Sequence, residues 1–387
     1  MVPRVLLIIL LVSMLFTLSV EATTMTPFME QQANQLNLER VEDYWWQIIR
    51  DYGGYLPELQ QRTLMEQITE STNPVSVATI FQRASHFFLH EVILNIKLLG
   101  TILLLTVFSM ILQTMQNAFE QNTVSKVAYA ITYLVLFILV INSFHVAISY
   151  ARDAIGQMSH FMLAIIPLIL TIMATTGSLA SVALFHPLII FMVNISSNII
   201  SNVVFPFLFF SAVIGMVSSI TERFPLSQLA GLLRKVSLGI MGVLLTIFLG
   251  VISVQGATSA VTDGIAIRTA KYVTSNFVPV VGRMFSDAAD TVMSASYLIK
   301  NSVGLVGVIV VVILCAFPAM KILSLSLIYQ LSSALMQPLG KNPIIDVLYQ
   351  IGRNMMFVFA ALATIGLLFF LTITMIISAG NISLMVR

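Results

Sequence analysis

Long apolar segments, separated by short polar ones, dominate the chain from residue 92 onward and predict membrane-spanning helices. Residues 92–112 and 127–148 are each long enough to cross the roughly 30 Å hydrocarbon core of a bilayer at about 1.5 Å per residue. Residues 154–221 contain no charged side chain, and the part from 160 to 220 can hold three short spans. The later predicted spans, which bring the count to about eight within a range of six to nine, are residues 236–256, 302–328 and 354–379.

Prolines interrupt the uncharged segment and predict broken helices. Pro167, Pro187 and Pro206 divide it, and a proline inside a helix removes one backbone hydrogen bond and clashes with the preceding turn. We therefore expect an all-α, polytopic membrane protein with Pro-broken helices. The segment also carries amides and hydroxyls that either bond one helix to another or line a pathway: Asn194, Ser196, Ser197, Asn198, Ser201 and Asn202.

An internal repeat is indicated, with residues 150–256 and 285–380 as the candidate copies. Short, proline-interrupted apolar segments at matching places are typical of discontinuous helices around a central pathway. The first copy has an additional apolar stretch, residues 207–219, so the two copies would cross the membrane a different number of times. Chance similarity between apolar segments is the alternative. The prolines whose spacings of 19 and 20 positions suggest the repeat are Pro187, Pro206, Pro318 and Pro338.

The N-terminus predicts export. Residues 1–22 combine a positive charge at Arg4, an apolar run and small residues near the expected cleavage point after Ala22, which is typical of a signal peptide. An uncleaved anchor helix is the alternative. A signal peptide would place the following residues outside the cytoplasm.

Residues 23–91 form a polar, acidic region that we expect to be extracytoplasmic and helical. Amphipathic patterning predicts one short helix on each side of the Gly53-Gly54 turn, at residues 36–49 and 59–68. From residue 92 to residue 387 the chain is a multi-span membrane domain. The aromatic residues of the polar region form either a docking or headgroup-level surface or part of a small packed helical cap: Tyr44, Trp45, Trp46, Tyr52 and Tyr55.

Composition excludes the soluble classes. Of the 387 residues, 58% are hydrophobic and 9% are charged, and the mean hydropathy is +0.96; a soluble domain has roughly 25% charged residues. The net charge of +2 sums an acidic N-terminal region and a more basic remainder, so no broad basic face supports nucleic-acid binding. The single cysteine, Cys315, excludes an intrachain disulfide and a cysteine-based zinc site.

Basic residues in short loops predict the orientation. Positive charge is retained on the cytoplasmic side of membrane proteins, and Arg223, Arg234 and Lys235 mark the most basic short loop. Lys341 and Arg353 mark a second candidate cytoplasmic loop. With residue 23 outside, two spans would return the chain to the outside near residue 152, and three more would bring it inside at residue 223.

The most polar part of the membrane domain is residues 257–301. Helical patterning on both sides of Pro279 predicts a hairpin, in which basic residues of the first arm would pair with Asp287 and Asp290 of the second. Inside a bilayer these charges must face one another or water, whereas on the surface they form a solvated face; both alternatives stay open. The candidate pathway or docking residues are Asp263, Arg268, Lys271, Arg283, Asp287, Asp290, Tyr297, Lys300 and Asn301.

The sequence contains no recognised catalytic motif. His86, His90 and Glu91 do not have the order of a zinc-protease motif. Gly340-Lys341 lacks the upstream glycine and the following Ser or Thr of a P-loop, and no G-x-S-x-G segment occurs. We therefore expect a protein that is not an enzyme and has no catalytic residue, cofactor or metal ion.

Four successive motifs, at residues 263–272, 276–282, 285–292 and 298–301, carry a family resemblance, together with a Gly-Gly-Tyr-Leu-Pro motif that begins at Gly53. With the signal sequence and the hydropathy profile, they resemble the stage III sporulation protein AE family of endospore-forming bacteria over nearly the whole chain. The resemblance implies a multi-pass protein of the mother-cell membrane, in a channel-like complex that joins mother cell and forespore.

The resemblance also implies partners. They would be other stage III sporulation operon proteins, namely a cytoplasmic ATPase and ring-forming membrane proteins, together with a forespore membrane protein; a homo-oligomer is a further alternative. We expect a non-enzymatic integral membrane component of a secretion-like channel complex. The alternative function is a permease that moves a small solute through a pathway between the two broken-helix repeats.

Overall fold

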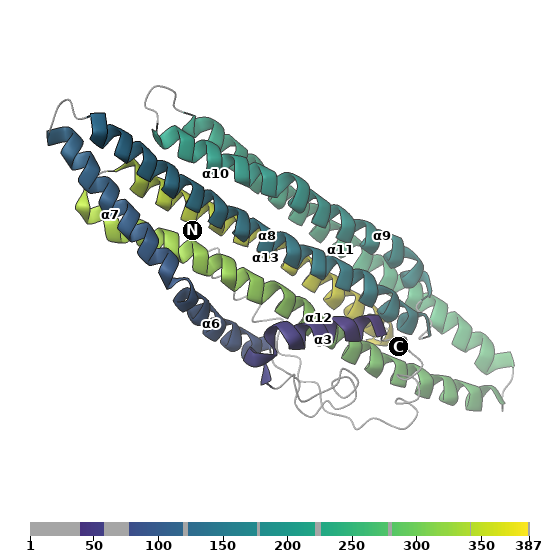
Figure 1. The fold of residues 1–387 in the computed structure, drawn as a ribbon. Coiled ribbons are helices and arrows are strands. Elements are labelled where there is room, and N and C mark those ends of the chain that lie inside the picture. Colours follow the sequence, from purple (N-terminus) through teal and green to yellow (C-terminus); the bar gives the residue numbers. More distant parts are fainter. Residues whose placement is uncertain are drawn as a thin grey trace.

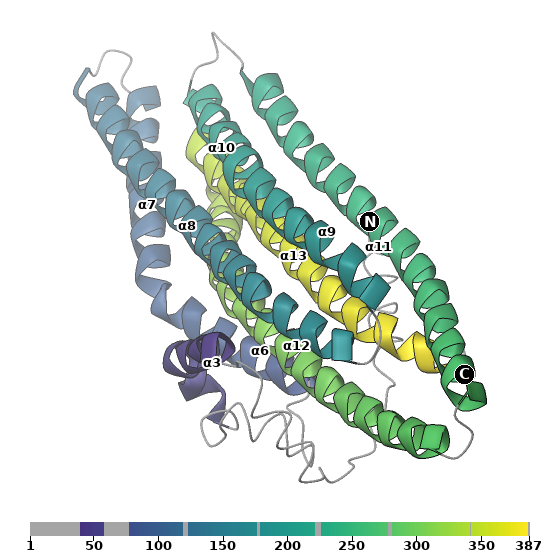
Figure 2. The same ribbon diagram turned by 90° about the vertical axis from the view of Figure 1, so that its right-hand side faces the viewer.

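The apolar segments form long helices that lie side by side in an elongated bundle (Figures 1 and 2). The computed structural model describes residues 39–57, 77–118, 123–175, 179–220, 226–277, 281–340 and 342–385. These residues contain helices and no β-strand, so the predicted all-α fold is confirmed. The helices are α3 (Glu39–Tyr52), η1 (Gly53–Tyr55), α6 (Val77–Leu94), α7 (Ile96–Ala118), α8 (Thr123–Thr175), α9 (Leu179–Ile199), η2 (Ile200–Val204), α10 (Phe205–Ile220), α11 (Ser227–Phe277), α12 (Val281–Met336), η3 (Gln337–Leu339) and α13 (Pro343–Met385).

Six helical stretches of the described chain are long and apolar enough to cross a membrane, so the chain is a polytopic membrane protein. Within the described residues, six is the lower limit of the predicted range of six to nine and lies below the expected count of about eight. The prediction of three short spans in residues 160–220 is wrong: α8 continues to Thr175, and α9, η2 and α10 follow one another without interruption. Fewer, much longer helices replace the predicted short ones.

The predicted helix breaks at Pro167, Pro187 and Pro318 are also wrong, because all three prolines lie inside helices. In a protein interior or in lipid, neighbouring helices and hydroxyl groups compensate for the backbone donor that a proline lacks. Pro206 lies in the first turn of α10, directly after the five-residue π-helix η2.

The long helices alternate in direction (Figures 1 and 2). We call the end at which α7, α10 and α12 finish and α8, α11 and α13 begin the upper end; α8 and α11 finish at the lower end. Residue 223 follows three candidate spans instead of the predicted five. Since both numbers are odd, the predicted side of this loop is unchanged, and it remains a prediction.

The candidate repeat has a simpler geometry than its sequence suggests. The first copy contains the second half of α8, the continuous helix formed by α9, η2 and α10, and the first part of α11; the second contains α12 followed by α13. The additional stretch at residues 207–219 lengthens a helix without adding a crossing, but the first copy still has one helical part more than the second. The repeat itself stays a prediction.

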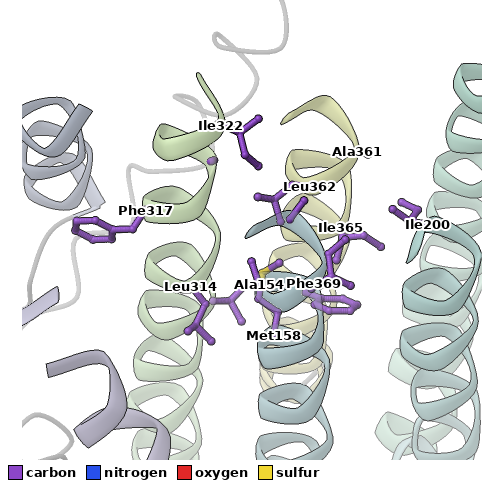
Figure 3. Packing of buried hydrophobic residues seen from close by; sticks show 14 of the residues in the cluster. Ala154, Met158, Ile200, Leu314, Phe317, Ile322, Ala361, Leu362, Ile365 and Phe369 are labelled. Carbon is purple, nitrogen blue, oxygen red and sulfur yellow. The ribbon is translucent and has the colours of Figure 1, made fainter. Parts of the chain in front are cut away.

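The interior of the bundle lies between α8, α12 and α13. Figure 3 shows Met158 of α8, Leu314 of α12 and Phe369 of α13 gathered there, and all three are at most 2% exposed. Helices α12 and α13 approach closely at Gly352, where a Cβ atom would lie 3.0 Å from the Ser326 carbonyl oxygen. The Ser326 hydroxyl donates to the Gly352 carbonyl at 2.7 Å, so the same contact also carries a hydrogen bond.

The described N-terminal segment packs against this bundle. The helix predicted at residues 36–49 is α3, whose Trp45 is fully buried, as is Leu56 after η1. Only Trp46 among the large aromatic residues of α3 is strongly exposed, at 46%. This supports the packed-cap alternative over an exposed aromatic surface. The predicted signal peptide (residues 1–22) and the helix at residues 59–68 lie outside the described residues.

Candidate functional site

An aromatic cluster fastens the N-terminal segment to the middle of α12. The Tyr52 ring stacks on Phe317 with 4.3 Å between centroids, and Phe87 of α6 meets Phe317 edge-on at 4.9 Å. Tyr55 in turn meets Phe87 edge-on at 4.9 Å. Such pairs prefer stacked or perpendicular geometries and contribute beyond the apolar area that they bury. We call Tyr52, Tyr55, Phe87 and Phe317 the aromatic junction; it joins α3, η1, α6 and α12.

Tyr52 is neutral in this setting. Burial, with a smaller contribution from the adjacent Asp51, raises the pKa of Tyr52 to about 12. The phenol therefore stays protonated at physiological pH and can remain against the Phe317 ring.

Lys321 continues the aromatic junction toward α8. Its ammonium group lies 5.1 Å from the centroid of Tyr150 and 6.0 Å from that of Phe87. A cation within about 6 Å of a ring face is attracted by the ring quadrupole. Lys321 thus links α6, α8 and α12 at one level of the bundle.

A polar face lies on the outside of α8, α9 and η2. The Arg152 guanidinium donates to the Ser201 carbonyl at 3.1 Å, and Ser201 belongs to the π-helix. Regions of π-helix are frequent at functional positions. The exposed residues that we call the polar face are Arg152, Asp153, Asn194, Asn198 and Asn202.

The three asparagines of the polar face follow one another at intervals of four, so they share one side of the helix. The Asn202 amide donates to Asn198 Oδ1 at 3.2 Å, and Asn198 donates to the Asn194 carbonyl at 2.9 Å. The neighbouring Ser197 points inward and donates to the Ser159 hydroxyl of α8 at 3.1 Å. The polar residues of this segment are therefore divided between helix–helix bonding and an outward surface.

A hollow lies between α3 and the lower half of α8. It presents a carboxylate, an amide and an imidazole, contributed by both helices. Its lining residues are Asp43, Tyr44, Gln47, His160, Leu163 and Ala164.

The predicted pathway or docking residues are divided between α11 and α12. Asp263, Arg268 and Lys271 are positions of α11, whereas Arg283, Asp287 and Asp290 are positions of α12. The placement of these six side chains lies outside the described residues. The predicted pairing between the two arms therefore stays a prediction.

The structure describes the side chains of the remaining three candidates, Tyr297, Lys300 and Asn301. Lys300 is fully buried and donates to the Ile377 carbonyl of α13 at 2.8 Å, and its ammonium group lies 5.1 Å from the Tyr297 ring. Tyr297 is 5% exposed, and Asn301 is partly buried. Lys300 and Tyr297 thus belong to the contact between α12 and α13 and not to an open surface.

Sequence reasoning did not select Arg152, Asp153 or Lys321. We placed residue 152 in an outside loop, whereas it lies near the middle of α8. A signal was available: Arg152 and Asp153 are the only charged residues between Lys126 and Glu222. Two adjacent charges within so long an apolar stretch indicate a position that lipid does not surround.

Of the two histidines considered as metal ligands, His86 and His90, the second lies beside an aromatic ring. The His90 ring lies 5.9 Å from the Tyr55 ring, beside the aromatic junction. Among the described residues, no three His, Cys, Asp or Glu side chains converge as a metal site would require.

Long apolar helices and a docked N-terminal segment define a polytopic α-helical membrane protein. The profile of the family described as stage III sporulation protein AE matches residues 59–380. The chain is 51% identical over 366 residues to the stage III sporulation protein AE of Bacillus subtilis (strain 168), which covers 95% of this chain and 92% of that protein. The chain therefore belongs to the stage III sporulation protein AE family and is a sporulation-related membrane protein. No solved structure matches it.

Proposed function

We propose that the protein is a non-enzymatic integral component of a secretion-like channel complex that links mother cell and forespore during endospore formation. Its place would be the mother-cell membrane. Membership in the sporulation family supports the process, and six membrane-length helices in the described chain support a membrane location. Because no P-loop occurs in the sequence, energy for transport would come from a partner or a gradient.

The observation that carries this proposal is the direction in which polar groups face. Asn194, Asn198 and Asn202 are exposed on the outside of the bundle. The interior between α12 and α13 is closely packed, with Cys315 directly against Gly366. An outward polar face and a tight interior favour contacts with other subunits over a solute pathway through the centre of one chain.

The proposed partners are other stage III sporulation operon proteins: a cytoplasmic ATPase, ring-forming membrane proteins and a forespore membrane protein. A second copy of this chain is also a candidate, because asparagine amides both donate and accept and can pair with the same face of a copy.

Variants of the polar face test the proposal. We expect Asp153→Asn combined with Asn198→Ala to reduce co-purification of the operon partners about tenfold, equivalent to ~1.4 kcal/mol of binding energy, and to lower the yield of heat-resistant spores. Both residues are exposed, so membrane abundance should stay normal. Phe191→Leu, at a position of α9 that is 58% exposed, is the matched apolar control and should retain partners. Unchanged partner recovery and spore yield in the double variant would count against the proposal.

Reconstitution separates the proposal from a permease. Purified protein in liposomes should show no substrate-specific uptake of small solutes in the absence of partners. Specific, saturable uptake by the protein alone would instead establish the permease and contradict the purely structural role.

A further inference from the structure

The helices are much longer than a bilayer is thick. Helix α8 has 53 residues and α12 has 56, which correspond to about 80 Å and 84 Å at 1.5 Å per residue. The hydrocarbon core is about 30 Å thick, and even a helix tilted by 40° crosses it in about 39 Å. More than half of each helix must therefore lie outside the hydrocarbon.

The exposed side chains of α8 change character along its length. In its upper part Val124, Ile131 and Ile138 are 75%, 56% and 66% exposed. From residue 142 to residue 175 no large hydrophobic side chain of α8 is strongly exposed. The exposed polar residues of this lower part include Asn142, His145, Arg152, Asp153, His160 and Thr171. The upper part has a surface for lipid, and the lower part has one for water or protein.

Helix α3 provides an independent marker of depth. It contacts α8 through Tyr44 and Phe161, whose centroids are 5.6 Å apart, and it leads directly into Tyr52, which stacks on Phe317 of α12. The outer side of α3 carries exposed charges at Asp43, Arg50 and Asp51. Since exposed charges are excluded from hydrocarbon, the levels of Phe161 and Phe317 lie outside it. Figure 2 shows α3 beside the lower half of the bundle.

Beyond the level of Phe317, α12 has the length and surface of a single crossing. Residues 321–336 span about 24 Å at 1.5 Å per residue, and the 3-10 helix η3 adds about 6 Å at 2.0 Å per residue, which together match the hydrocarbon thickness. The exposed apolar residues of this part of α12 recur at intervals of four on one side and are Leu327, Leu331 and Leu335. Lys321, Tyr150 and Tyr52 then lie at the boundary, where amphipathic aromatic and basic side chains gather.

We propose that the bilayer covers only the upper half of the bundle and that the lower half projects from the membrane on the extracytoplasmic side. The boundary passes through Lys321 of α12 and the segment of α8 between Asn142 and Arg152. Lys235 and Arg353 are both exposed in the upper half. Since positive residues favour the cytoplasmic side of a membrane, the upper end faces the cytoplasm. On α9 and α11 exposed apolar side chains extend further down, so the bundle is tilted in the membrane.

This placement decides between the two readings of the polar segment at residues 257–301. The end of α11 at Phe277 and the start of α12 at Val281 lie at the lower end (Figure 1). At about 1.5 Å per residue, Val281 is roughly 60 Å along α12 from Lys321. The charged positions of this segment therefore lie in the projecting half, and Lys300 among them is buried against α13.

Cysteine labelling along α8 tests the proposal. In a Cys315→Ala background, single Val124→Cys, Ile138→Cys and His160→Cys variants are treated with a membrane-impermeant maleimide in sporulating cells whose outer layers have been opened. We expect His160→Cys to react in intact membranes and Val124→Cys to react only after permeabilisation. Ile138→Cys should react at least tenfold more slowly than His160→Cys in intact membranes, and at least tenfold more slowly than both after permeabilisation. Thr171→Cys should behave like His160→Cys.

A buried control distinguishes protein packing from lipid. Met158 of the lower half is fully buried, so Met158→Cys should react only in denaturing detergent. If it reacts in native membranes, the variant has lost its fold, and His145→Cys and Thr171→Cys decide the test. Labelling of His160→Cys and Thr171→Cys only after permeabilisation, or Ile138→Cys labelling as fast as theirs, overturns the proposal.

Discussion

Helices α11 and α12 are almost equally apolar but occupy different environments. The mean hydropathy of their membrane-length stretches is 2.4 for α11 and 2.8 for α12. Among the 18 most apolar consecutive residues of each helix, 22% are buried inside the protein in α11, compared with 72% in α12. Hydropathy identifies both as membrane helices, but it does not show which of the two is surrounded by other helices.

Small residues explain part of the difference. A Cβ added at Gly304 or Gly307 of α12 would meet isoleucine side chains of neighbouring helices. At Gly239, Gly242 and Gly250 of α11 nothing lies within 4 Å of such an atom. The glycines of α12 permit close helix packing, as in other membrane bundles, whereas those of α11 leave open surface.

The largest expected effect comes from shortening the same side chain on the two helices. Ile313 of α12 is fully buried, and Ile247 of α11 is 56% exposed. We expect Ile313→Ala to lower the free energy of unfolding by about 2–5 kcal/mol, because it opens a cavity, and Ile247→Ala to change it by at most about 0.5 kcal/mol. The measurement is thermal unfolding of both purified variants in one detergent. Equal destabilisation would mean that another subunit or helix covers α11.

The second effect comes from adding a methyl group. In Gly352→Ala the new Cβ would lie 3.0 Å from the Ser326 carbonyl oxygen and 3.1 Å from the Gln330 backbone nitrogen. Backbone atoms of α12 cannot rotate away, so we expect a loss of about 1–3 kcal/mol. The control is Gly242→Ala on α11, which meets nothing and should be neutral or stabilising by up to about 1 kcal/mol, since alanine favours helix.

Chemical unfolding followed by circular dichroism compares the two glycine variants. If Gly352→Ala is as stable as the parent, α12 and α13 separate more readily than their contact suggests. If Gly242→Ala is the less stable of the two, the assignment of α11 to the periphery is wrong.

The helical, membrane-embedded character was predictable because apolar length and absence of charge determine it locally. The number of crossings was not, because Pro167 and Pro187 suggest breaks that packing against neighbouring helices removes. Helix length also misled: residues 160–175 are apolar enough for lipid but belong to a helix whose exposed lower face is polar. Burial by other helices and contact with lipid select the same residue types, so one sequence does not separate them.

Only the part of the candidate site that is marked by local sequence could be predicted. The ionisable positions near Pro279 were visible as polar residues in an apolar context, yet the burial of Lys300 against Ile377 depends on α13, some 77 positions away. The role of Phe317 was hidden altogether, since a phenylalanine before a proline in an apolar run has no local mark of its contact with Tyr52. Long-range contacts of this kind are properties of the fold and not of a segment.

The smallest expected effect concerns the N-terminal segment, which packs against α12 through the contact between Tyr52 and Phe317. Below about pH 10 the Tyr52 phenol is neutral both docked and free. Burial raises the pKa of docked Tyr52 from 10.0 to about 12, so as pH rises through this range the free phenol ionises first and docking weakens. Tyr52→Phe keeps the ring on Phe317 and should remove this pH dependence.

Trp45 and Trp46, the only tryptophans of the chain, report detachment as a red shift of fluorescence, because Trp45 is fully buried when α3 is docked. The parent protein should shift between pH 10 and 12 and the variant at a higher pH. Identical transitions in both would show that another group controls the docking of α3.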